Sequence, residues 1–166
     1  MKRNRGFTIF EMLVVLAIII VITSLALANY RQGQKNYSLL QAAQKLAVDL
    51  RQAQGMAVTG TTTSGQPLGG YGIYIQDSAN YLLFLNTTAA DVNGCPATSE
   101  RLSVKTIALP AGVTMATAGT SAFFAPPEPR SCFNNTSALQ EIYFTLTQGG
   151  NTKTVKVIKN GSIEIQ

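Results

Sequence analysis

The sequence predicts an α+β fold, in which one long N-terminal α-helix packs on a C-terminal antiparallel β-sheet. Three features of the 166-residue chain predict this class. An apolar run near the start is long enough to span a membrane, and the segment after it repeats apolar residues at helical spacing. From Gly69 the apolar period changes to two, which is typical of strands. We expect one globular domain over residues 59–166, a comfortable size for a single core.

A basic segment, residues 1–6, opens the chain and ends in Gly6; its charges are Lys2, Arg3 and Arg5. Residues 7–29 follow as an apolar helix of about 22 residues, enough to cross a ~30 Å hydrocarbon core. By the positive-inside rule the N-terminus lies in the cytoplasm and the rest of the chain beyond the membrane. A secretory signal has its cleavage site after the apolar run. Here the small residue, Gly6, precedes the apolar run, so cleavage after Gly6 would leave the helix on the mature protein.

Glu11 is the single acid within this apolar segment. A carboxylate there costs roughly 2.5–3.5 kcal/mol on insertion scales, so it needs a partner or a purpose. An uncleaved signal anchor on an unrelated exported domain is the alternative interpretation. That alternative leaves the cost of Glu11 unexplained, and we therefore favour cleavage after Gly6.

The run Gly6-Phe-Thr-Ile-Phe-Glu11, followed by Met-Leu-Val-Val-Leu-Ala-Ile-Ile, closely resembles the cleavage and methylation motif of type IV prepilins and type II secretion pseudopilins. The resemblance implies that a prepilin peptidase cuts between Gly6 and Phe7 and N-methylates Phe7. It also implies that Glu11 pairs with the N-terminal amine of a neighbouring subunit during assembly. In low dielectric an acid and an amine are each costly alone and tolerable as a close pair.

The same resemblance implies the partners and the location of the protein. The partners would be other pilin or pseudopilin subunits, the peptidase and an inner-membrane assembly platform. The protein would be stored in the cytoplasmic (inner) membrane and then enter a periplasmic or cell-surface filament. Many family members have a proline where this chain has Ala28 and a glycine where it has Ile20. We therefore expect a straighter helix here.

The spacing of apolar residues in the segment 30–58 predicts that this segment forms the amphipathic second half of the same helix. Its apolar stripe is Leu39, Ala43, Leu46, Leu50, Ala53 and Ala57, and the polar side is Gln41, Gln44, Lys45, Asp49, Arg51 and Gln52. Gly60, a Thr-rich run and Pro67 end the helix in a loop. We expect the stripe to dock on a sheet of the same chain.

The β-rich part begins with a hairpin, Tyr71–Gln76 and Tyr81–Asn86, around the polar turn Asp77–Asn80. The other strands are expected at Arg101–Leu109, Val113–Ala116, Ala122–Ala125, Leu139–Thr147, Thr152–Ile158 and Ile163–Ile165. Polar and glycine-rich turns, Gln148–Asn151 and Asn160-Gly161, join the last three. All of them are expected in one antiparallel sheet.

Three further fragments resemble the H-type minor pseudopilins and their fimbrial relatives: Asp49–Gln54, Gly72–Ile75 and Val155–Ile163. The major pseudopilins of secretion systems typically bind calcium in a late acidic loop. The acids here are scattered and form no cluster of oxygen ligands: Asp77, Asp91, Glu100 and Glu128. We expect no metal and no cofactor, which favours a minor subunit.

Cys95 and Cys132, the only two cysteines, fall in loop-like segments beyond the membrane. On the exported side a disulfide is chemically permitted, and only one intrachain pairing exists. The alternative is two free thiols in a host with a reducing exterior. We expect the disulfide.

Lys153, Lys156 and Lys159 gather within the last hairpin, although removal of the leader would leave only ten basic residues against eight acidic ones. They could contact phosphates of DNA, as in fimbrial relatives of the H type that take part in DNA uptake. They could equally guard a strand edge against aggregation, and the absence of aromatic interleaving favours this second role.

Catalysis finds little support, since the chain has no histidine and no nucleophile elbow or phosphate loop. We therefore expect a structural, non-enzymatic subunit of a type IV pilus or type II secretion pseudopilus. The alternatives are a DNA-binding minor pilin and, remotely, a signal-anchored exported enzyme. The sequence does not decide between a major and a minor subunit, which machine the subunit serves, or what its filament carries.

Overall fold

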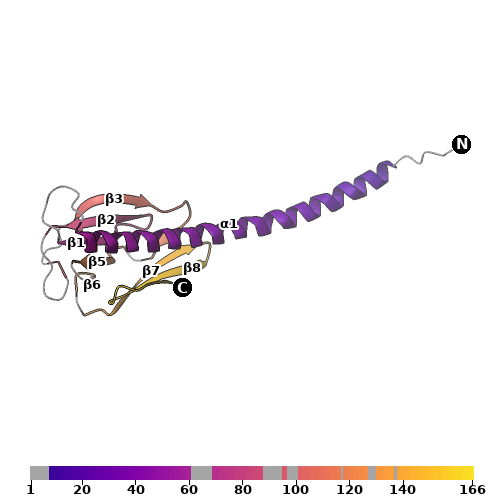
Figure 1. Ribbon diagram of the computed structural model, residues 1–166. Helices are drawn as coiled ribbons and strands as arrows, with labels where there is room; N and C mark the ends of the chain where they lie inside the picture. Colours follow the sequence, from indigo (N-terminus) through magenta and orange to yellow (C-terminus); the bar gives the residue numbers. More distant parts are fainter. Residues whose placement is uncertain are drawn as a thin grey trace. The chain divides into compact units, whose positions relative to one another are not determined.

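The computed structural model describes residues 8–60, 69–87, 95–96, 101–116, 118–126, 130–136 and 138–166. One helix, α1 (Ile9–Thr59), precedes strands that form two antiparallel sheets, an α+β arrangement as predicted (Figure 1). By internal contacts the chain divides into a first unit, Met1–Asn36, and a second unit, Tyr37–Gln166. The helix contributes its first part to one unit and its second part to the other.

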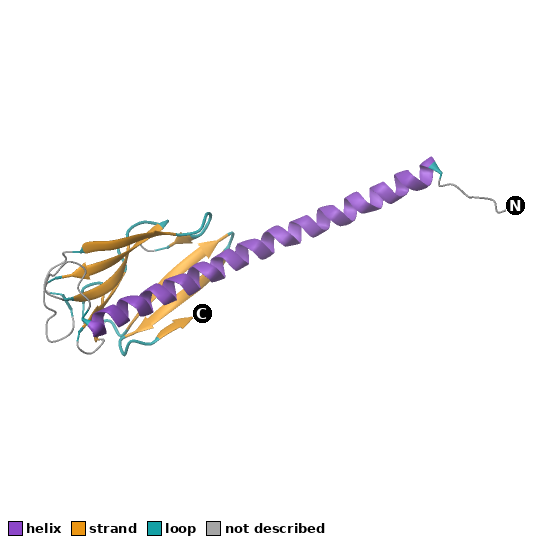
Figure 2. Cartoon of the chain, turned by 45° about the horizontal axis from the view of Figure 1, so that its top comes forward, coloured by secondary structure: helices purple, strands orange, loops and turns teal. Residues whose placement is uncertain are grey.

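The second part of α1 packs as its apolar stripe predicts. Every residue of the stripe is at most 2% exposed: Leu39, Ala43, Leu46, Leu50, Ala53 and Ala57. They share one core with strands of both sheets, and Figure 2 shows this part of the helix lying along those strands. The helix ends where Gly60 adopts a positive φ of 65° and its N–H bonds to the Ala57 carbonyl. Glycine takes this left-handed conformation without the clash that a Cβ would cause.

The larger sheet has five strands in the order β3-β2-β1-β5-β6, each pair antiparallel. Their bounds are β1 Gly70–Ile75, β2 Asn80–Asn86, β3 Leu102–Ala108, β5 Ser121–Ala125 and β6 Arg130–Phe133. The predicted hairpin between β1 and β2 is confirmed. In its turn the Asp77 carboxylate accepts hydrogen bonds from the N–H groups of Ala79 (2.7 Å) and Asn80 (2.8 Å). These bonds fix the turn that the polar residues predicted.

The smaller sheet has four strands in the order β4-β7-β8-β9. Their bounds are β4 Thr114–Met115, β7 Glu141–Gln148, β8 Asn151–Ile158 and β9 Ile163–Ile165. The expectation of a single sheet is wrong, because β4 pairs with β7 and with no strand of the larger sheet. Strand β6 was also missed, since Arg130–Phe133 stands between a proline-rich run and two asparagines that resemble a loop.

Both faces of the larger sheet are covered around β2 and β5. Leu83 and Leu85 belong to the core beneath α1. Phe84, between them, joins a separate group that we call the outer cluster: Phe84, Cys95, Phe123, Ala125 and Cys132. Successive residues of a strand point to opposite faces, so the outer cluster lies on the face away from α1.

Candidate functional site

The N-terminal motif contains the signal that starts α1. Thr8 precedes the helix, and its hydroxyl accepts a hydrogen bond from the Glu11 N–H at 3.2 Å. The Thr8 carbonyl accepts the first helical bond, from the Met12 N–H. This is the N-cap arrangement, and the sequence Thr-x-x-Glu is its usual signature. This signature of a helix start was not among the features predicted from the sequence. A glutamate at this position also meets the positive end of the helix dipole.

Of the predicted processing residues, Gly6 and Phe7 lie outside the described part of the chain. Glu11 lies inside it, with an exposed side chain, and forms no ion pair with any residue from 8 onward that the structure describes. Cleavage after Gly6, methylation of Phe7 and the pairing of Glu11 stay predictions.

The first part of α1 presents an apolar surface. Its large hydrophobic side chains from Ile9 to Leu25 are exposed, from 43% at Val14 to 83% at Ile9. The two hydroxyls on this stretch are satisfied by the helix itself, because Thr23 donates to the Ile19 carbonyl and Ser24 to the Val21 carbonyl. By length and composition α1 can cross a membrane. Such a surface is stable only against lipid or other apolar helices.

A buried polar contact anchors the second part of α1 to the larger sheet. The Asp49 carboxylate accepts hydrogen bonds from the Tyr81 hydroxyl of β2, at 2.6 Å, and from the Lys45 ammonium group. Burial, and then the adjacent Asp49 carboxylate, raises the pKa of the Tyr81 hydroxyl well above its ordinary value. Tyr81 therefore stays a hydrogen-bond donor throughout the physiological range.

Asp49 is a correction to the predicted polar side of the helix. It is only 3% exposed, whereas we expected it on the polar side of the helix. The spacing indicated this burial, because Asp49 follows Leu46 by three residues and precedes Ala53 by four, and both of these lie on the buried stripe. The opposite face of the helix, including Gln41 and Gln44, is exposed as expected.

The predicted disulfide is present between Cys95 and Cys132. It belongs to the outer cluster, where the Phe84 and Phe123 rings stack with centroids 6.1 Å apart. Cys132 lies in β6, opposite Phe123, rather than in a loop as expected. The alternative of two free thiols is therefore wrong for this structure.

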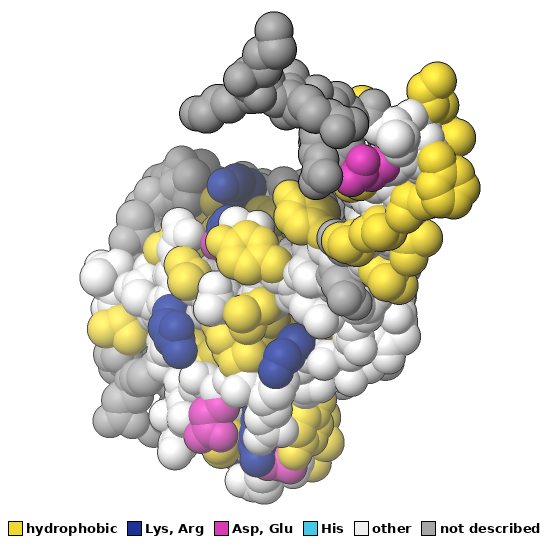
Figure 3. All heavy atoms as spheres, turned by 90° about the vertical axis from the view of Figure 1, so that its right-hand side faces the viewer, with side chains coloured by type: hydrophobic (Ala, Val, Ile, Leu, Met, Phe, Trp, Pro, Cys, Tyr) yellow, Lys and Arg dark blue, Asp and Glu magenta, His cyan; other side chains and the backbone are white. Residues whose placement is uncertain are grey.

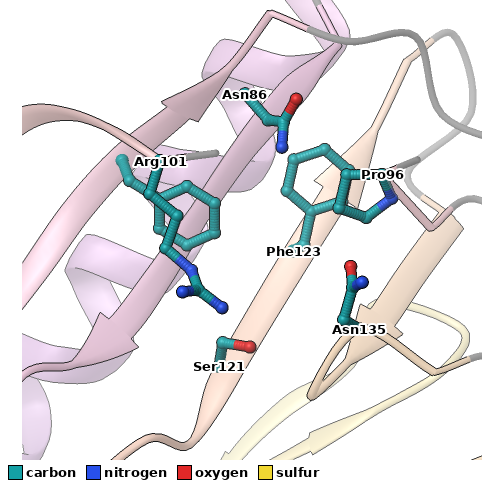
Figure 4. Close-up of a pocket in the computed structure, with 7 residues that line it drawn as sticks. Asn86, Pro96, Arg101, Ser121, Phe123 and Asn135 are labelled. Carbon is teal, nitrogen blue, oxygen red and sulfur yellow. The ribbon is translucent and has the colours of Figure 1, made fainter. Parts of the chain in front are cut away.

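Beside the disulfide, a small pocket brings together side chains from distant segments. It is lined by Phe84, Asn86, Pro96, Arg101, Ser121, Phe123 and Asn135. Figure 4 shows the Arg101 guanidinium group pointing toward Ser121, with Phe123 and Asn135 at its side. The guanidinium carbon lies 4.3 Å from the centre of the Tyr74 ring and 5.6 Å from that of Phe84. A cation held against aromatic faces is already oriented for an anionic group.

The three lysines of the last hairpin do not form one cluster. Lys153 and Lys156 are an odd number of positions apart on β8, so they point to opposite faces of the sheet. Lys156 forms an ion pair of 2.7 Å with Glu141 on β7, and this contact lowers the pKa of the Glu141 carboxyl group. On the face that Figure 3 shows, the Lys and Arg side chains are dispersed among apolar and neutral ones. Nothing in this arrangement favours a nucleic-acid surface.

No group of three acidic, cysteine or histidine side chains that could hold a metal occurs among the residues that the structure describes. Three of the scattered acids, Asp91, Glu100 and Glu128, lie outside those residues.

Comparison with known proteins identifies two segments. Residues 1–27 match the prokaryotic N-terminal methylation motif, and residues 42–162 match the family of the Type II transport protein GspH. The chain is also similar to the Type II secretion system protein H of Escherichia coli (strain K12), with 35% identity over 79 residues. That match covers 48% of this chain and 43% of the relative, so it spans less than half of either. No solved structure matches the chain.

Both family matches include part of α1: the methylation motif covers its start, and the GspH match begins at residue 42, in its second part. The latter match takes in most of the second unit: the end of α1, the larger sheet with the disulfide, and the smaller sheet except β9. The chain therefore belongs to the Type II transport protein GspH family, and thus to the pseudopilins that its first residues resemble.

Proposed function

We propose that the protein is a minor structural subunit of a type II secretion pseudopilus, anchored in the inner membrane before assembly. The observation that carries the proposal is the exposed apolar surface of α1 between Ile9 and Leu25, which directly follows a methylation motif. The membership of the second unit in the GspH family supports the choice of machine. A family of structural subunits also fits a non-enzymatic role.

In this proposal a prepilin peptidase cuts after Gly6 and methylates Phe7. The positive leader keeps the N-terminus in the cytoplasm, and the second unit lies on the far side of the membrane. On assembly, apolar helices of neighbouring subunits replace lipid around α1, while the inner-membrane platform delivers each subunit. Glu11 then pairs with the amine of Phe7 on an adjacent subunit, so that neither charge is left alone in the apolar bundle.

The test is whether the chain enters filaments and whether secretion needs it. Cells of the native host that lack the chain should lose secretion of the machine's exoproteins and regain it when the full chain is supplied. Filaments sheared from the complemented cells should contain the chain with Phe7 as its first residue. Normal secretion without the chain, or filaments from which it is absent, would contradict the proposal.

The alternative of DNA uptake gains no support from the described residues, since Lys153 and Lys156 point to opposite faces of the sheet. A gel shift of the full chain with DNA over a salt series distinguishes the two functions. A pseudopilus subunit should bind DNA weakly and without preference among sequences.

A further inference from the structure

We propose that the free edge of β3 is a docking surface for an extended, acidic segment of another protein, which adds to the larger sheet as a further strand. The surface, which we call the β3 edge, consists of the backbone of Leu102–Ala108 on the side away from β2. The cation of Arg101 flanks it on the face of the outer cluster, and that of Lys105, opposite Leu83, flanks it on the face of α1. This binding goes beyond filament formation and does not depend on it.

The backbone of β3 is available on one side. Within the described residues, β3 pairs with β2 alone and stands at the end of the strand order. The Leu109 N–H donates to the Ala79 carbonyl at 2.8 Å, and bonded positions alternate along an antiparallel ladder. The N–H groups of Thr106 and Ala108 therefore point away from β2. An exposed strand with such unpaired groups is a template for strand addition.

The charge of the β3 edge selects the partner. Residues 101–116 contain no aspartate or glutamate, and neither Arg101 nor Lys105 forms an ion pair in the described part of the chain. Arg101 is half-buried against the Tyr74 and Phe84 rings, so its side chain is already ordered before a partner arrives. A second copy of β3 would bring like charges together, which is unfavourable. An added strand with acidic side chains is complementary in charge to the β3 edge.

On the face of the sheet toward α1, the β3 edge borders an apolar cavity. A cavity of about 210 Å³ lies between α1 and the end of β3, lined mainly by Ala42, Tyr81, Ile107, Leu109 and Pro110. A space of this size accepts an aliphatic side chain. Tyr81 belongs to the core side of the sheet, whereas Arg101 contacts Phe84 of the outer cluster. Since alternate side chains of a strand point to opposite faces, one added strand can place an acid at Arg101 and an apolar group in this cavity.

The probe is a short synthetic peptide of alternating valine and glutamate, blocked at both ends, titrated into the detergent-solubilised full chain. Its control is the same peptide with lysine in place of glutamate. Binding is followed by fluorescence of a label on the peptide, and the contact is located by hydrogen exchange. We expect the acidic peptide to bind more tightly than the lysine peptide, to weaken as salt rises, and to slow exchange at Thr106 and Ala108.

Two pairs of variants separate the backbone contribution from the charge contribution. Thr106→Pro removes an outward N–H and leaves the bonds to β2, so binding should fall by about tenfold or more. Thr106→Val keeps the N–H and should bind like the wild type. Arg101→Glu should reverse the preference toward the lysine peptide, whereas Lys153→Gln on the other sheet should leave it unchanged. Far-ultraviolet circular dichroism and the intact disulfide verify the fold of each variant.

Three results would overturn the proposal. They are the absence of binding by the acidic peptide, equal binding of the two peptides, and equal binding to Thr106→Pro and Thr106→Val. If Thr106→Pro fails to fold, the charge reversal by Arg101→Glu decides alone, because Arg101 belongs to neither of the two clusters of buried residues.

Discussion

Glu11 takes part in the helix cap within its own chain, and we propose a second role for it between chains. Within one chain it stands at the third helical position, where its N–H bonds to the Thr8 hydroxyl and its carboxylate meets the positive end of the helix dipole. Between chains its carboxylate is proposed to pair with the amine of Phe7. The first role uses the backbone of Glu11 and the second its side chain, so substitutions can separate them.

We expect Glu11→Leu to give a stable, cleaved protein that stays in the membrane and does not enter filaments. Leucine removes the acid from the apolar segment, which favours membrane insertion, and it leaves the hydrogen bond from the backbone N–H to Thr8 intact. The incoming subunit, however, loses its charged contact with the one already docked. Mass spectrometry of membrane extracts and immunoblots of sheared filaments measure the two properties.

Thr8→Val is the matched control, because it removes the cap at a cost of about 1 kcal/mol and keeps the acid. It should still assemble. Glu11→Gln, which keeps the shape and removes the charge, should behave like Glu11→Leu. Wild-type assembly of Glu11→Leu would show that this carboxylate is not the assembly contact.

The Asp49–Tyr81 contact permits a second prediction at this scale. Tyr81→Phe removes the hydroxyl and leaves a buried carboxylate without one of its donors, so the free energy of unfolding should fall by about 1–3 kcal/mol. The control is Tyr143→Phe, whose hydroxyl is exposed and donates to Glu141; it should change stability by less than about 0.5 kcal/mol. Urea unfolding of the detergent-solubilised chain measures both. Equal effects would show that Asp49 does not rely on Tyr81.

At the scale of elements, local patterns in the sequence predicted the second part of α1 and the hairpin of β1 and β2. The second part of α1 has one buried face, and its apolar spacing therefore located the stripe from Leu39 to Ala57. The larger sheet is buried on both faces around Phe84 and Phe123, where apolar alternation disappears. The sequence could not show that β4 would pair with β7 in a second sheet, since pairing between distant strands leaves no local period.

The glycines of β1 and α1 make a matched pair of variants. A Cβ on Gly72 would lie 2.5 Å from the Ala122 carbonyl oxygen of β5 and 2.7 Å from the Phe84 ring, so Gly72→Ala should destabilise by about 1–3 kcal/mol. Gly55 lies on an exposed turn of α1 with no atom near its Cβ position, and Gly55→Ala should stabilise by roughly 0.5–1 kcal/mol. Thermal unfolding of both variants tests the close approach of β1 and β5. A neutral Gly72→Ala would contradict it.

The disulfide ties Cys95 to strand β6 across 37 positions of sequence. Its loss through Cys95→Ala with Cys132→Ala should lower the free energy of unfolding by roughly 2–4 kcal/mol. The wild-type protein exported by cells should show no free thiol when alkylated without reductant. Complete alkylation of both cysteines in that sample would contradict the bridge.

At the scale of the molecule, the two units need different surroundings. The second unit buries its apolar side chains in a core of its own, whereas those of the first unit up to Leu25 are exposed. The N-terminal run predicted this difference, because a membrane-length apolar segment needs no partner within its own chain. The contact of Asp49 with Tyr81 and the position of β3 at the end of its sheet could not be predicted in the same way. The first joins residues 32 positions apart, and the second depends on which strands pair.

In the proposed function, removal of the leader peptide is the switch between storage in the membrane and assembly. While residues 1–6 are attached, Phe7 has no free amine, and Glu11 therefore lacks the partner proposed for it in the filament. Gly6→Val places a branched side chain at the cleavage site, where the resemblance to prepilins implies that only a glycine fits beside the peptidase carboxylates. We expect this variant to accumulate in the membrane with Met1 or Lys2 as its first residue, folded and disulfide-bonded, and to be absent from filaments. Gly55→Ala, remote from the leader, is the control and should be cleaved and methylated at Phe7. Filaments built from uncleaved Gly6→Val would show that assembly requires neither the free amine nor its pairing with Glu11, and the membrane cost of that acid would then need another cause.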